Sequence, residues 1–103
     1  MDKIASLRKI LAMDPKNSFA RYGIAMELVK MDQTDEAIAE FNQLLEIDPH
    51  YTAGYFMAAQ TLATLGRNGE AIDRLKNGIG AAARAGNTHA VNEMQAMLDD
   101  LRR

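Results

Sequence analysis

The chain has 103 residues, of which 48% are hydrophobic and 25% charged, which is the size and composition of one ordinary globular domain. Its formal net charge of −2 offers no electrostatic basis for binding DNA or RNA, and the absence of cysteine excludes disulfides and thiolate metal sites. No apolar run approaches the roughly 18 residues that span a bilayer, and Asp2 and Lys3 stand where a signal peptide is apolar. We therefore expect a soluble, cytoplasmic protein with no membrane or nucleic-acid partner.

Apolar residues recur at helical spacing along the chain, and no segment shows the alternation of a strand. Ile24, Leu28 and Met31, for example, are spaced i, i+4 and i+7. In the first segment Ile4, Leu7 and Leu11 share one face, as in a helix that covers a core on one side. The pattern predicts six helices, at about residues 2–13, 18–31, 35–47, 51–65, 69–85 and 88–102.

The ends of these helices are marked by residues with known backbone preferences. Asp14-Pro15 and Asp48-Pro49 each follow an apolar stretch, and proline disfavours helix at the residue before it. Gly66 and Gly86 stand where a left-handed residue ends a helix. Thr34 and Asn68 are predicted to cap the helices that follow them.

The punctuation repeats with a fixed period. The two prolines, Pro15 and Pro49, lie 34 residues apart, and each follows an aspartate. Carried onward, the same period places Glu36-Ala37-Ile38 on Glu70-Ala71-Ile72 and Phe41 on Leu75. Several independent matches at one period indicate an array of repeated helix pairs.

A helix-turn-helix unit with this period and these residues resembles the tetratricopeptide repeat (TPR). The small residue that the family has in its first helix corresponds to Ala25 and Ala59, and the alanine of its second helix to Ala37 and Ala71. The resemblance implies an all-α fold of antiparallel helix pairs stacked as a short α-solenoid. It divides a single domain, 1–103, into an N-terminal half repeat (1–15), repeats at 18–51 and 52–85, and a C-terminal capping helix (88–103).

The chain departs from the family pattern at two positions. The bulky aromatic residue near the repeat start is present as Tyr55 but is Arg21 in the first repeat, and Gly78 stands where the first repeat has Leu44. The last helix fits the pattern of a first helix after an insertion of two residues. The initiating Met1 leads us to expect a stand-alone protein, not a piece of a longer array.

Residues that could carry catalysis or bind a metal are sparse. His50 and His89 are far apart in sequence and lack metal-ligand spacing, so we interpret them as turn and helix-start residues. Asp99 and Asp100 are neighbours on a helix, where their side chains diverge. We expect no enzyme activity, no cofactor and no metal.

The resemblance implies instead a groove, lined by the first helices of the repeats, that binds a peptide or helix of a partner protein. The basic clamp with which some members hold a carboxylate is not reproduced, which leaves an apolar patch with an acidic end. Alternatively, some of these side chains pack between repeats, or the apolar surface or the last helix forms a homodimer. The predicted partner-binding residues are Phe19, Tyr22, Met26, Lys30, Phe56, Met57, Gln60 and Asn92.

Overall fold

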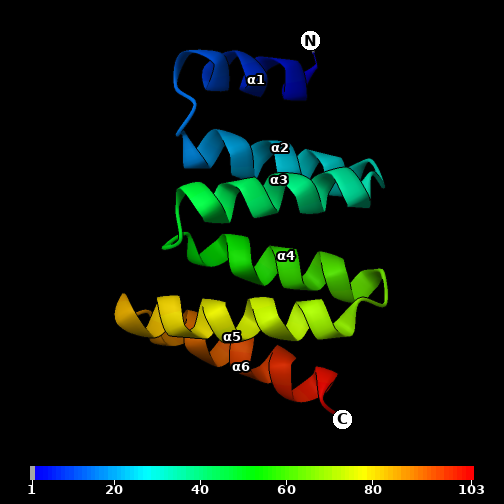
Figure 1. Ribbon diagram of the computed structural model, residues 1–103, viewed down its shortest axis with the longest axis vertical. Coiled ribbons are helices and arrows are strands. Elements are labelled where there is room, and N and C mark those ends of the chain that lie inside the picture. Colours follow the sequence, from blue (N-terminus) through cyan, green and yellow to red (C-terminus); the bar gives the residue numbers. More distant parts are fainter. Residues whose placement is uncertain (1) are drawn as a thin grey trace.

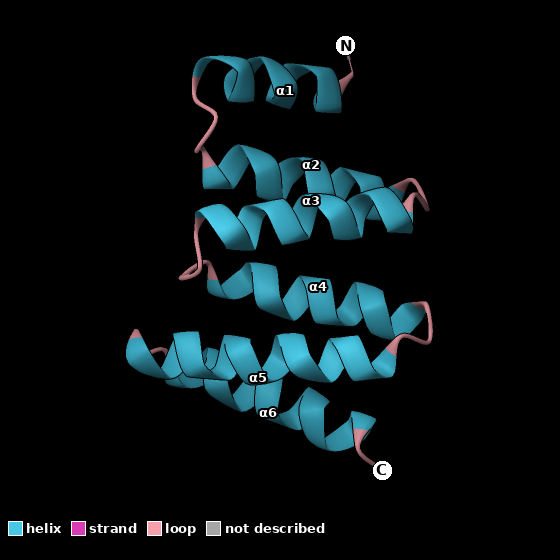
Figure 2. Ribbon diagram, viewed as in Figure 1, coloured by secondary structure: helices cyan, strands magenta, loops and turns pink. Residues whose placement is uncertain are grey.

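The computed structural model describes residues 2–103, which form six α-helices and no strand (Figures 1 and 2). Each predicted helix is confirmed, and every end lies within one residue of the sequence prediction. The helices are α1 (Lys3–Met13), α2 (Ser18–Lys30), α3 (Thr34–Ile47), α4 (Thr52–Thr64), α5 (Asn68–Arg84) and α6 (Thr88–Leu101).

Successive helices run antiparallel and stack in chain order along the longest axis of the molecule, with α1 at one end and α6 at the other (Figure 1). The molecule measures 42 × 29 × 19 Å. Each helix packs against the next along the chain, and α4 also touches α6. This is the all-helical solenoid that the sequence predicts.

Two kinds of turn join the helices. After α1 and α3 the chain turns at Asp-Pro, as predicted. After α2, α4 and α5 it turns through a residue with positive φ: Asp32 (61°), Gly66 (76°) and Gly86 (71°). Asp32 lies one 34-residue period before Gly66 and adopts the same left-handed conformation without the freedom of glycine.

The caps predicted at Thr34 and Asn68 are wrong. Both residues already lie inside their helices, and Gln33 and Arg67 occupy the cap positions with no side-chain cap. A capping side chain must belong to the last non-helical residue before the helix. Because the turns are tight, each helix starts one residue earlier in the chain than predicted, and Thr34 and Asn68 become its first residues. At α5 the carboxylate of Glu70 instead accepts a 2.6 Å hydrogen bond from Arg67 Nε. Side-chain caps are found at Asp2, Asn17 and Asn87.

Alanines allow the paired helices to approach closely. Ala25 and Ala37 in the first pair, and Ala59 and Ala71 in the second, are all fully buried. With no side chain beyond Cβ, they let neighbouring backbones come together while larger residues fill the space around them. The residues that fill the two repeats, Phe41 and Leu75, are likewise inaccessible to solvent.

Gly78 is buried where α5 meets both α4 and α6. A Cβ at this position would lie 2.6 Å from Tyr55 Cβ and 2.6 Å from Met94 Sδ. The Tyr55 side chain is fixed in turn, since its hydroxyl donates a 2.8 Å hydrogen bond to the Pro49 carbonyl. Gly78 is thus required by the large neighbours on both adjacent helices.

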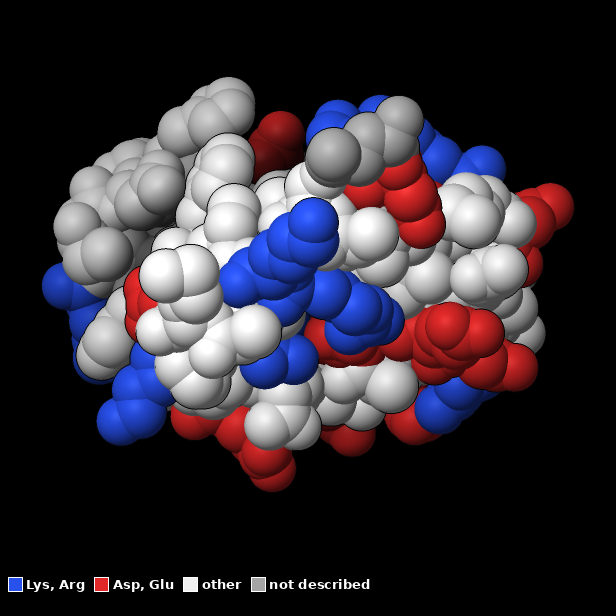
Figure 3. All heavy atoms as spheres, turned by 90° about the horizontal axis from the view of Figure 1, so that it is seen from above, with Lys and Arg blue, Asp and Glu red and all other residues white. Residues whose placement is uncertain are grey.

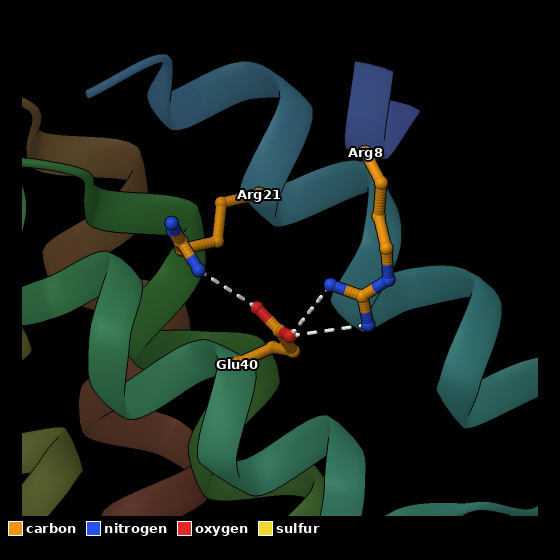
Figure 4. A network of polar contacts seen from close by, with 3 residues as sticks. All are labelled: Arg8, Arg21 and Glu40. Carbon is orange, nitrogen blue, oxygen red and sulfur yellow. Dashed lines mark hydrogen bonds and ion pairs between the residues drawn. The ribbon is translucent and has the colours of Figure 1, made fainter. Parts of the chain in front are cut away.

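Arg21, which replaces the aromatic residue in the first repeat, takes part in an ionic network (Figure 4). Its Nη1 lies 3.1 Å from Glu40 Oε2, and Arg8 Nη1 lies 3.4 Å from Glu40 Oε1. The side chains of Arg21 and Glu40 are only 17% and 15% exposed. The network connects α1, α2 and α3, and so ties the N-terminal half repeat to the first full repeat.

Candidate functional site

The helices α2, α4 and α6 border two adjacent hollows, which share Met57. We call this surface the α2–α4–α6 face. The first hollow, of about 280 Å³, is lined by Tyr22, Thr52, Ala53, Phe56, Met57, Asn87, His89, Ala90, Glu93 and Met94. The second, of about 220 Å³, is lined by Val29, Asp32, Thr34, Met57, Gln60, Thr61 and Thr64.

Aromatic and methionine side chains form the wall of the first hollow. The ring of Tyr22 is held between Phe41, with an edge-to-face centroid distance of 6.3 Å, and Tyr51, at 5.2 Å. Burial raises the pKa of the Tyr22 phenol above its usual value. Its hydroxyl makes no hydrogen bond within the described chain. The hollow therefore offers a rigid apolar surface with an unused polar group beside it.

The charged groups in the two linings are acidic. Glu93 borders the first hollow, and its Oε2 lies 3.8 Å from His89 Nε2, an ion pair when the imidazole is protonated. Asp32 borders the second hollow and makes no ion pair with any residue in 2–103. No lysine or arginine of that segment lines either hollow. The face is thus suited to a ligand that carries positive charge.

Four of the eight predicted binding residues line the hollows. Tyr22 and Phe56 lie on the first, Gln60 on the second, and Met57 on both. They come from α2 and α4, whose alternating place in the stack puts them on the same side of the molecule. The helical register of the repeats is what brings these side chains together.

The structure places the other four predicted residues outside both hollows. Met26 is half-buried against the core around Ile24, and Asn92 is exposed on α6. Phe19, at the start of α2, is 75% exposed. Lys30 Nζ lies 3.3 Å from Glu27 Oε1, and the carboxylate of Glu27 also binds Lys3.

Several lining residues were not among the sequence predictions. Except for Met94, they are polar or small residues, whose type alone does not suggest binding. For Ala90 and Met94 on α6, the two-residue insertion before that helix is the signal that bears on their placement, since it shifts their register against the repeat. These additional residues are Thr52, Asn87, Ala90 and Met94 in the first hollow, and Asp32, Thr34 and Thr61 in the second.

A third hollow, of about 220 Å³, lies between α3, α4 and α5 and is more polar. Arg74 donates a short hydrogen bond to the Asn42 side chain across it. Within residues 2–103, no group of three or more histidine, aspartate or glutamate side chains is placed to hold a metal ion. None of the six described helices has both the length and the hydrophobicity needed to cross a membrane.

The sequence matches one family profile and resembles known proteins over most of its length. The sequence profile of the tetratricopeptide repeat matches residues 28–98. Protein DIA2 of Eremothecium gossypii is 33% identical over 70 residues, which make up 68% of this chain but 10% of that protein. A TPR repeat-containing protein of Pseudomonas aeruginosa is 27% identical over 100 residues, covering 97% of this chain and 95% of its own.

Solved structures agree with the sequence relatives. A tetratricopeptide repeat domain protein of Salinibacter ruber superposes with a TM-score of 0.81 at 33% identity, covering 85% of this chain and 89% of its own. PcrH, solved in complex with the chaperone binding region of PopD, has a TM-score of 0.88 at 15% identity, covering 96% and 75%, and shares the fold alone. The chain belongs to the tetratricopeptide-repeat family.

Proposed function

We propose that the chain is a non-catalytic adaptor that binds a peptide or helix of a partner protein on the α2–α4–α6 face. The observation that carries this proposal is the first hollow, where Tyr22, Phe56 and Met57 leave an apolar surface open to solvent. All three side chains are half-buried, and aromatic and methionine side chains whose remaining surface lines an open hollow are typical of interaction sites. PcrH, which has the same fold, holds a segment of another protein, and this supports the proposal by analogy.

The chemistry of the linings favours binding over catalysis. Apart from Asp32, His89 and Glu93, the linings consist of apolar side chains, hydroxyls and two amides. These groups can bury a ligand and form hydrogen bonds with it, but they are poor proton donors and acceptors near neutral pH. The one imidazole at the face, on His89, is exposed and has Glu93 as its ionic partner. A general base would need a positioned nucleophile beside it. Of the two hydroxyls in the first lining, that of Thr52 donates to the His50 carbonyl, and the pKa of the Tyr22 phenol is raised by burial.

The alternative is self-association through the same apolar surface or through the last helix, and two side chains disfavour the docking of a second copy at the ends of the stack. By the repeat register, Lys3 on α1 stands where α3 has Ala37, and Gln95 on α6 stands where α4 has Ala59. Those alanines are where paired helices approach most closely, so long polar side chains hinder a second copy from docking there. Lysine and arginine side chains also lie on the α1 end of the molecule, among acidic and uncharged ones (Figure 3).

Selection from a random peptide library against the purified protein tests the proposal. Selected peptides are expected to bind the wild type and to lose binding to Ala53→Arg, because residue 53 is exposed and its new side chain would fill the first hollow. Phe19→Ala is the matched control, since it removes an exposed aromatic ring outside the hollows. Equal loss in both variants, or no selected peptide at all, would contradict the proposal.

Light scattering over a range of protein concentrations separates the two functions. A monomer at all concentrations is the expected result and leaves the face open for a partner. A stable dimer that Ala53→Arg dissociates would instead assign the face to self-association.

A further inference from the structure

We infer that the α2–α4–α6 face takes an extended, basic segment of its partner, with two apolar side chains three residues apart, one in each hollow. This inference rests on the proposed function and adds the chemistry and conformation of the ligand. It is carried by three features of the face: the distance between the hollows, the unused polar groups beside them, and the sign of the charge around them.

The distance between the hollows sets the spacing of the two apolar side chains. On α4 the first hollow is lined from Thr52 to Met57, and the second from Met57 to Thr64. Their centres are thus about six residues apart, which is ~9 Å at the rise of an α-helix. An extended polyproline-type chain advances ~3.1 Å per residue with three residues per turn, so side chains i and i+3 point the same way at ~9 Å.

Unused polar groups favour an extended ligand over a helical one. The Tyr22 hydroxyl at the first hollow and the Gln60 amide at the second make no hydrogen bonds within the described residues. An extended peptide has free backbone N–H and C=O groups that these side chains can bind, whereas a helix satisfies its own. The face therefore offers more to an extended segment.

Charge defines the rest of the ligand. Glu93 borders the first hollow and Asp32 the second, and neither has a lysine or arginine partner in the part of the chain that the structure describes. The two cations of α2, Arg21 and Lys30, are already paired with Glu40 and Glu27. A lysine or arginine in the ligand would meet, at either end of the face, a carboxylate that has no lysine or arginine partner of its own.

The test uses short, end-blocked, fluorescein-labelled peptides of glycine, serine and two lysines, with a pair of leucines at i and i+1, i+3 or i+7. Fluorescence anisotropy is expected to show tightest binding for the i, i+3 peptide. Replacing one leucine with serine is expected to weaken that binding about tenfold. Exchanging both lysines for glutamates should also weaken it about tenfold, since it turns attraction into repulsion. Glu93→Gln should reduce the difference between lysine and glutamate peptides, whereas Asp73→Asn, on α5 away from the face, should preserve it.

Several results would overturn the inference. Tightest binding of the i, i+7 peptide would indicate a helical ligand, and equal binding of lysine and glutamate peptides would remove the role of charge. If library-selected peptides lose binding to Ala53→Arg but have neither the i, i+3 apolar pair nor basic residues, the proposed function stands and the inference fails. If the i, i+3 peptide binds wild type and Ala53→Arg equally, its site lies elsewhere and both fail.

Discussion

Gly78→Ala isolates the effect of close packing between α5 and its two neighbours. The new Cβ would lie 2.6 Å from Tyr55 Cβ and 2.6 Å from Met94 Sδ. Carbon atoms in ordinary contact are about 3.5–4.0 Å apart, so the overlap is about 1 Å. Met94 can change rotamer, but Tyr55 Cβ is fixed to the backbone of α4, and α5 must therefore move.

The magnitude follows from two opposing effects. Overpacking a core position costs about 1–3 kcal/mol, and we take the upper part of that range because one contact is with an atom that cannot rotate away. Replacing glycine with alanine inside a helix returns about 1 kcal/mol. The expected net loss in the free energy of unfolding is therefore about 1–2 kcal/mol.

Gly80→Ala provides the matched control on the same helix. Its Cβ would meet only the end of the Arg84 side chain, at 3.4 Å. We expect this variant to gain about 0.5–1 kcal/mol from helix propensity. Urea denaturation followed by circular dichroism should separate the two variants by about 2 kcal/mol, or roughly 10 °C in Tm. Equal stabilities, or a Gly78→Ala variant more stable than wild type, would refute the packing argument.

Three further predictions concern single residues. Asp32→Gly is expected to raise the free energy of unfolding in urea by about 0.5–1 kcal/mol, because Asp32 has φ of +61°, which glycine adopts without steric cost. An unchanged stability would contradict this. Glu40→Gln is expected to lower the free energy of unfolding by about 1–2 kcal/mol, a value between those of exposed and buried ion pairs. In a double-mutant cycle, adding Arg21→Gln to Glu40→Gln should cause little further loss of stability. The hydrogen bond from Lys3 holds the pKa of Glu27 below 4.5, so Glu27 contributes stability above that pH and loses the contribution as the pH falls. Denaturation at neutral pH and at about pH 3 should therefore show Glu27→Gln less stable than wild type only at neutral pH, and an equal deficit at both would contradict the assignment.

The repeat period is why the helices could be predicted so closely from sequence. Asp-Pro pairs and the glycines at 66 and 86 fix backbone geometry locally, so they specify helix ends without knowledge of the rest of the chain. The caps at Thr34 and Asn68 were wrong for a related reason. Asp32 and Gly66 both adopt positive φ in the same tight turn, after which each helix begins one residue earlier than the cap prediction assumes.

The site was less predictable than the fold. The repeat register predicts that Phe19 lies in the groove. In the structure its side chain, at the start of α2, is 75% exposed and borders neither hollow. The first hollow depends on how α6 packs on α4, which the sequence leaves open because of the two-residue insertion before α6. The Arg21–Glu40 pair was missed because its members are 19 residues apart and lie off the repeat pattern.

The account centres on the α2–α4–α6 face, and NMR titration of labelled protein with a library-selected peptide tests it most directly. The account predicts that the largest chemical-shift changes fall on Tyr22, Ala53, Phe56 and Glu93, which line the first hollow. Changes centred on Asn42 and Asp73, at the hollow between α3 and α5, would contradict it and move the partner surface to the opposite helices.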